Sequence, residues 1–74
     1  MKEKVIEIIA QVLGVPTSEV TVDTEIGELD EWDSLRNMQI FSSLQEVYSV
    51  KISQEMLVDL ENVSDIIDLI ESLR

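Results

Sequence analysis

The stretch DEWDSL, residues 30–35, separates an acidic connection from the best-formed amphipathic segment of the chain. Before it, residues 15–33 hold isolated apolar residues among acids. After it, residues 35–48 repeat apolar side chains with helical spacing. A Ser that follows Asp at a helix start is ordinarily an N-cap, whose oxygen accepts a backbone N–H two or three residues on. The simplest interpretation of Ser34 is therefore an N-cap.

Three segments carry apolar residues at helical spacing and predict the longer helices: residues 3–13, residues 35–48 and the segment that follows an N-cap at Asn62. Gly14 suits a left-handed C-terminal cap, and Ser53 suits the N-cap of a short helix. The residues expected to face inward are Val5, Ile6, Ile8, Ile9, Val12 and Leu13; Met38, Ile40, Phe41, Leu44, Val47 and Tyr48; Met56, Leu57 and Leu60; and Val63, Ile66, Ile67, Leu69, Ile70 and Leu73. The predicted fold is all-α, a four-helix bundle of three longer helices and one short helix, in one domain over residues 1–74.

The connection over residues 15–33 is long for a compact domain, which suggests that it has a function. One helical turn is expected near Pro16, and a few apolar residues should pin the loop over the helices: Val20, Val22, Ile26 and Leu29. The acids do not have EF-hand spacing, because Glu28 and Ser34 take the places of the loop's glycine and final glutamate when counted from Asp23. Only weak, non-specific cation binding is expected there, and no metal site.

Charge restricts the partners of the chain. Sixteen acidic and five basic residues give a net charge of −11. This field repels nucleic acid and anionic membranes and favours partners with basic surfaces. No apolar run has membrane-spanning length and residues 1–4 do not lead into a signal peptide, so we expect a cytoplasmic protein that does not insert into membranes. We also expect a monomer.

The chain has neither His nor Cys. Without an imidazole base, a hydrolase that uses Ser34 is excluded. Without a thiol, any thioester chemistry requires a prosthetic group that is made elsewhere.

The chain resembles the acyl carrier protein family. The resemblance rests on Trp32-Asp33-Ser34-Leu35 at a mid-chain helix start, on residues 50–53 and on residues 62–66, in a small acidic helical chain. It implies that Ser34 carries a covalent 4′-phosphopantetheine, which a phosphopantetheinyl transferase adds from coenzyme A. The thiol of the arm would hold acyl or aminoacyl groups as thioesters, so the chain is a carrier and not an enzyme. Asp33 would assist recognition by the transferase; its alternative role is a loop-to-helix hydrogen bond.

The resemblance also implies an acyl- or aminoacyl-loading ligase and downstream transferases with basic surfaces. Carriers of fatty acid synthesis usually have several acids on the second helix and small residues before Asp-Ser-Leu. Here that helix has Arg36, Gln39 and a single acid, Glu46, and Trp32 precedes the motif. These departures favour a specialised pathway over housekeeping fatty acid synthesis.

Two alternative functions stay open. Residues 38–40 are weakly similar to D-alanyl carrier proteins, so an aminoacyl cargo is one alternative. An acidic helical adaptor that never receives a prosthetic group is the other.

Leu35 lies in the polar stripe of the second helix. It either folds back against the loop, onto Trp32, or contacts a partner beside the modified serine. The predicted partner-binding residues are Leu35, Arg36, Met38, Gln39 and Glu46.

Overall fold

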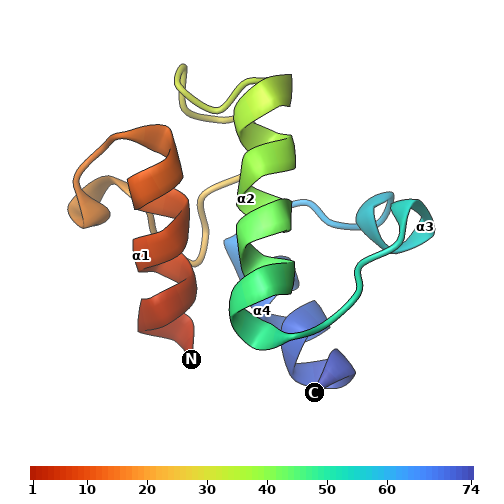
Figure 1. Cartoon of the computed structure of the whole chain (residues 1–74). Helices are drawn as coiled ribbons and strands as arrows, with labels where there is room; N and C mark the ends of the chain where they lie inside the picture. Colours follow the sequence, from red (N-terminus) through yellow and green to blue (C-terminus); the bar gives the residue numbers. More distant parts are fainter.

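The computed structural model describes residues Met1–Arg74, and its regular structure is helical (Figure 1). The elements are α1 (Lys2–Leu13), the short 3₁₀-helix η1 (Thr17–Glu19), α2 (Ser34–Tyr48), α3 (Gln54–Leu57) and α4 (Val63–Leu73). An isolated antiparallel bridge between Glu25 and Asn62 is the only β-type pairing. The prediction of an all-α bundle with three longer helices and one short helix is confirmed.

The predicted helix ends are confirmed by their hydrogen bonds. Gly14 has a φ of 73°, and its N–H donates to Ala10 O at 2.8 Å. Asn62 Oδ1 accepts the Asp65 N–H at 2.9 Å, and Asp65 Oδ2 accepts the Glu61 N–H at 2.9 Å. This reciprocal arrangement satisfies the Asp65 N–H in the first turn of the helix and the N–H of the residue before the cap.

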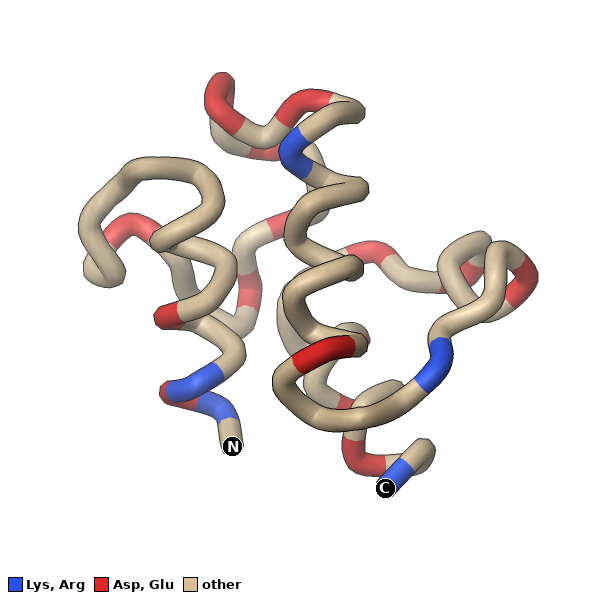
Figure 2. The backbone as a smooth tube through the Cα atoms, viewed as in Figure 1, with Lys and Arg blue, Asp and Glu red and all other residues tan.

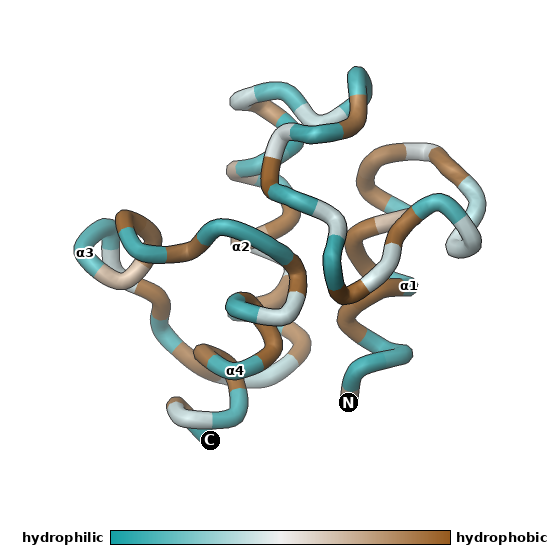
Figure 3. Tube along the Cα trace, turned by 180° about the vertical axis from the view of Figure 1, so that it is seen from behind, coloured by the Kyte–Doolittle hydropathy of each residue, from teal (hydrophilic) through white to brown (hydrophobic).

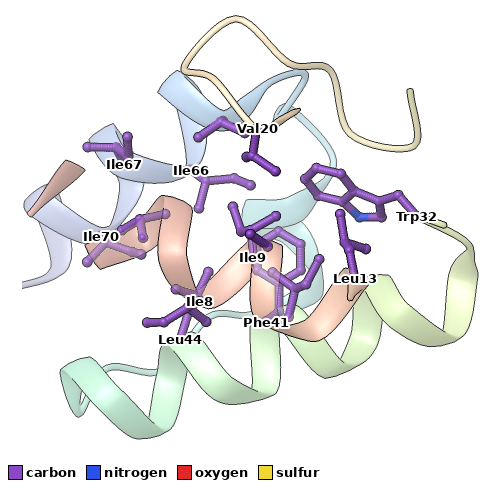
Figure 4. Packing of buried hydrophobic residues seen from close by; sticks show 14 residues of the cluster. Ile8, Ile9, Leu13, Val20, Trp32, Phe41, Leu44, Ile66, Ile67 and Ile70 are labelled. Carbon is purple, nitrogen blue, oxygen red and sulfur yellow. The ribbon is translucent and has the colours of Figure 1, made fainter. Parts of the chain in front are cut away.

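The core is built where α1, α2 and α4 face one another, with two side chains added from the loop (Figure 4). Ile9, Ile40, Leu44, Ile66 and Ile70 are fully buried. The other members of the cluster are Val5, Ile8, Ala10, Leu13, Val20, Trp32, Phe41, Val63 and Ile67.

Three residues that were expected to face inward are exposed: Met38 (71%), Val47 (49%) and Met56 (36%). The prediction was wrong for them because a helical wheel gives the apolar side of a helix but not how much of that side its neighbours cover. Met38 and Val47 lie on a part of α2 that the neighbouring elements leave uncovered. Met56 belongs to the four-residue helix α3, which has no buried residue.

The loop over residues 15–33 is fastened to the start of α4. Val63 N–H donates to Thr24 O at 3.0 Å, and Ser64 N–H donates to Val22 O at 2.9 Å. In return, Ile26 N–H donates to Glu61 O at 2.9 Å. Figure 3 shows the loop from behind as it crosses the molecule with alternating apolar and polar residues. The predicted anchors are confirmed, since Val20 is buried and Val22, Ile26 and Leu29 pack against the core.

Acidic residues are spread over the backbone, and several lie in the loop beside the start of α2 (Figure 2). Arg36 is the basic residue of that region. None of the helices has both the length and the apolar character needed to span a bilayer.

Candidate functional site

The N-terminus of α2 is capped by Asp33 and not by Ser34. Asp33 has an extended backbone (φ −93°, ψ −176°), and its Oδ1 accepts the Arg36 N–H at 2.8 Å. The interpretation of Ser34 as an N-cap is therefore wrong, and α2 begins at Ser34, one residue before the predicted start. The alternative role of Asp33, a loop-to-helix hydrogen bond, is confirmed. The capping bond does not involve the Ser34 hydroxyl, and the residue is exposed.

Trp32 anchors the loop directly before this turn. Its side chain is only 4% exposed, and its Nε1–H donates to Asn37 Oδ1 at 2.9 Å. Its backbone N–H donates to Leu29 O at 2.9 Å. Burial of an indole is strongly favourable when its N–H has a partner, so Trp32 holds the loop on the first turn of α2. The sequence did not show this role. The available signal was a single large apolar residue among acids.

Arg36 joins the start of α2 to the end of α1. Its Nη1 donates to Val12 O and to Leu13 O, both at 3.2 Å. Carbonyls in the last turn of a helix lack intrahelical partners and carry partial negative charge, so a cation is well placed there. Contact between Arg36 and a partner stays a prediction, but the half-buried guanidinium already has partners within the chain.

A hollow of about 190 Å³ lies directly beside Ser34. Its lining combines the loop and the first turn of α2: Ile26, Gly27, Trp32, Asp33, Ser34 and Asn37. Gly27 has a φ of 85°, a conformation that glycine adopts without strain. The site residues are thus a buried indole, a capping carboxylate and a free serine hydroxyl at one edge of the molecule.

The geometry suits a phosphate group on Ser34. The Asp33 side chain accepts the Arg36 N–H, and the Asp33 backbone carbonyl accepts the Asn37 N–H. The Ser34 and Leu35 N–H groups have no hydrogen-bond partner in the chain. Free N–H groups and the helix dipole stabilise an anion at a helix N-terminus. The exposed hydroxyl is also accessible to a second protein.

Leu35 and Met38 form an exposed apolar pair beside the serine, at 61% and 71% exposure. Leu35 does not fold back onto Trp32, so that account of its position is wrong. Gln39 and Glu46 are exposed on the same helix. The structure therefore places four of the five predicted partner residues on the surface, and their contact with a partner stays a prediction.

The other end of α2 holds a tyrosine, Tyr48, whose surroundings change its pKa. Burial raises the pKa of the Tyr48 phenol; the nearby Arg74 lowers it and Glu7 raises it. The Tyr48 hydroxyl is buried without a hydrogen-bond partner, and the Arg74 guanidinium lies 5.5 Å from the ring centroid. This group belongs to the packing of the helix ends and not to the site at Ser34.

Comparison with known proteins identifies the family. Residues 3–70 match the family described as "Phosphopantetheine attachment site". The chain is 38% identical over 69 residues to the acyl carrier protein of Streptococcus pneumoniae serotype 4, covering 93% of this chain and 89% of that one. The chain belongs to the acyl carrier protein family.

Further members of the acyl carrier protein family support the assignment. The Thermobifida fusca protein is 35% identical over 65 residues, covering 88% of this chain and 82% of that one. The solution structure of holo acyl carrier protein from Geobacter metallireducens superposes with a TM-score of 0.86 at 30% identity, covering 97% of this chain and 83% of that one. Family members are carriers and not catalysts, and their prosthetic group is covalent phosphopantetheine.

Proposed function

We propose that Ser34 is the attachment residue and that the chain carries acyl or aminoacyl groups as thioesters on a phosphopantetheine arm. The observation that carries the proposal is the exposed Ser34 hydroxyl at the first position of α2, which the Asp33 cap leaves free. The adjacent N–H groups of Ser34 and Leu35 support the same assignment, because they stabilise the phosphate of the product.

The attachment step is a phosphoryl transfer. Ser34 Oγ forms a bond to the pantetheine-side phosphorus of coenzyme A, the phosphoanhydride bond breaks, and adenosine 3′,5′-bisphosphate leaves. The hydroxyl proton passes to a base of the transferase, because this chain has no His to accept it. The transferase also supplies the metal ion. Once bound, the arm supplies the thiol on which cargo is carried, and this chain presents that arm to loading and downstream enzymes.

The composition of α2 supports a specialised pathway over housekeeping fatty acid synthesis. That helix holds one acid, Glu46, and its Arg36 is tied to α1. A partner enzyme that recognises several carboxylates on α2 has only Glu46 to contact on this helix. An aminoacyl cargo is the alternative within the family.

The test of attachment is intact mass after incubation with coenzyme A, magnesium and a broad-specificity phosphopantetheinyl transferase. The wild-type chain should gain the mass of one arm. Ser34→Ala should gain none while it keeps its helical circular dichroism. Ser42→Ala, an exposed serine further along α2, is the matched control and should be modified like wild type. A mass gain in Ser34→Ala contradicts the assignment, and no gain in wild type favours the unmodified adaptor.

The exposed pair Leu35 and Met38 is proposed as the apolar part of the partner-binding surface. In a strongly negative field, such a pair suits a partner with an apolar notch ringed by Lys or Arg, where charge speeds encounter and apolar contact slows dissociation.

In the modification assay, Leu35→Asp should slow the transferase at least about tenfold, the equivalent of ~1.4 kcal/mol, with an unchanged melting temperature. Val47→Asp adds the same charge to an exposed apolar site at the far end of α2 and should have little effect. Equal rates in the two variants, or a loss of melting temperature in Leu35→Asp, contradict the proposed surface.

A further inference from the structure

The side-chain amide of Asn37 has a defined orientation. Asn37 lies three residues after Ser34, on the same side of the first turn of α2, and lines the hollow beside it. Its Oδ1 accepts the Trp32 Nε1–H at 2.9 Å. An indole N–H is only a donor, so it selects the oxygen end of the amide. The Nδ2H₂ group therefore points away from the indole, with both of its N–H donors free of hydrogen bonds within the chain.

The hollow combines these donors with an apolar wall and with the residue Asp33, whose Oδ1 is engaged by the Arg36 N–H. Ile26 and Trp32 supply the apolar surface, and Gly27 has no side chain to fill the space. Ser34 forms one edge, where its N–H and that of Leu35 remain unpaired. A volume of about 190 Å³ has room for a small group that is anionic at one end and branched apolar at the other.

The first segment of 4′-phosphopantetheine has this chemistry. It begins with the phosphodiester, which is followed by a carbon that carries two methyl groups and then by a hydroxyl and an amide. We propose that the hollow seats this segment, with the Asn37 Nδ2H₂ group donating to the phosphate and the two methyl groups lying against Trp32 and Ile26. The inference rests on the proposed attachment at Ser34.

Binding of this segment in the hollow leaves the proposed partner surface uncovered. The near part of the arm lies against the loop, on residues that do not include Leu35 or Met38. The exposed apolar pair thus stays free for a partner while the thiol end of the arm extends into solvent.

The test compares the unmodified and modified forms of the full chain. Trp32 is the only Trp, so both its fluorescence and its indole Nε1–H resonance report on the hollow without ambiguity. We expect modification to shift the Trp32 indole signal and the Asn37 Nδ2H₂ signals in ¹H–¹⁵N spectra.

The decisive variant is Asn37→Asp. A carboxylate keeps an acceptor for the Trp32 N–H but removes both amide donors and adds a negative charge near the phosphate. The unmodified variant should keep the hydrogen bond from Trp32, and its own Trp32 signal is the reference; relative to that reference, the shift on modification should be lost. Gln11→Glu makes the same chemical change at an exposed site on α1 and should keep the full shift.

The outcomes distinguish binding of the first arm segment in the hollow, which we call the seat, from attachment of the arm to Ser34. No mass gain on the wild-type chain overturns the attachment. A normal mass gain with unchanged Trp32 and Asn37 signals overturns the seat and leaves the attachment standing. A full shift in Asn37→Asp overturns the role of its amide. Ile26→Ala, which reduces the apolar wall and leaves the Trp32–Asn37 bond, is the second variant; its shift should fall, and an unchanged shift also contradicts the seat.

Discussion

The starts of α2 and α3 use the same kind of cap but differ in what surrounds it. Asp33 Oδ1 accepts the Arg36 N–H at 2.8 Å, and Ser53 Oγ accepts the Met56 N–H at 3.4 Å. The first turn of α2 is also held by the Trp32–Asn37 bond and by Arg36 on the end of α1. Helix α3 has four residues, none of them buried, and lies apart from the other helices (Figure 1).

From this difference we expect that a local cap alone does not protect an element from opening. Short segments with few buried contacts open at low free energy, whereas packed elements open only with much of the fold. The turn that presents Ser34 is held by contacts from distant parts of the chain. Helix α3 and the turn after it are fixed to the core by the half-buried Leu57 and Leu60, so we expect this region to open at lower free energy than the site.

The largest expected effect comes from removing the indole at the α2 junction. Trp32→Ala leaves a cavity and orphans Asn37 Oδ1, so it should lower the free energy of unfolding by about 3–5 kcal/mol. Val58→Ala, beside α3 at a side chain that is 80% exposed, should change it by less than about 0.5 kcal/mol. Urea unfolding of both variants measures the two changes in the free energy of unfolding. Equal losses would show that side chains at the α2 junction and beside α3 contribute equally to stability.

A smaller effect is expected from the Arg36 link. Arg36→Gln removes the two bonds to Val12 O and Leu13 O; charged hydrogen bonds contribute about 1.5–3 kcal/mol, but partial solvent exposure reduces the expected loss to about 1 kcal/mol. Lys51→Gln removes the same charge at an exposed residue near α3 and should cost much less. If the two variants unfold at the same urea concentration, the link between α1 and α2 contributes little beyond charge.

Equal or smaller effects are expected from the two caps. Asp33→Ala should lower the free energy of unfolding by about 1 kcal/mol, the typical contribution of an N-cap. Ser53→Ala should change it by only a few tenths of that amount, since α3 is short and its capping bond is long. Chemical denaturation measures both losses, and Asp33→Asn, which keeps a capping oxygen, should retain most of the stability. A larger loss in Ser53→Ala than in Asp33→Ala would reverse the comparison between the two regions.

Much of the fold could be predicted because its signals are local. The Gly14 and Asn62 caps depend on backbone groups within a few residues, and the helical spacing of apolar residues follows from 3.6 residues per turn. The resemblance of Trp32-Asp33-Ser34-Leu35 to the family's motif pointed to the same serine that the structure exposes.

Other features required the tertiary structure. A helical wheel placed Met38 near the core side of α2, but coverage by neighbouring helices decides exposure, and none covers it. Asp33 and Ser34 both have capping side chains, so the register of the first turn decided which of them caps and which stays free. The bond of Trp32 to Asn37 depends on the path of the chain into α2, and the contact of Arg36 with the end of α1 depends on how two helices pack.

The sequence by itself therefore determined where the helices lie and how they end, because hydrogen bonds within one or two turns decide these features. The resemblance of residues 32–35 to the family's motif, and not a local hydrogen bond, pointed to Ser34. Only the tertiary structure decided how that serine is held and what lies beside it. The hollow at Ser34 forms where a loop residue, Gly27, meets the first turn of α2. No local sequence pattern specifies this contact between the loop and α2. It results from the burial of Trp32 and from the hydrogen bonds between the loop and the start of α4.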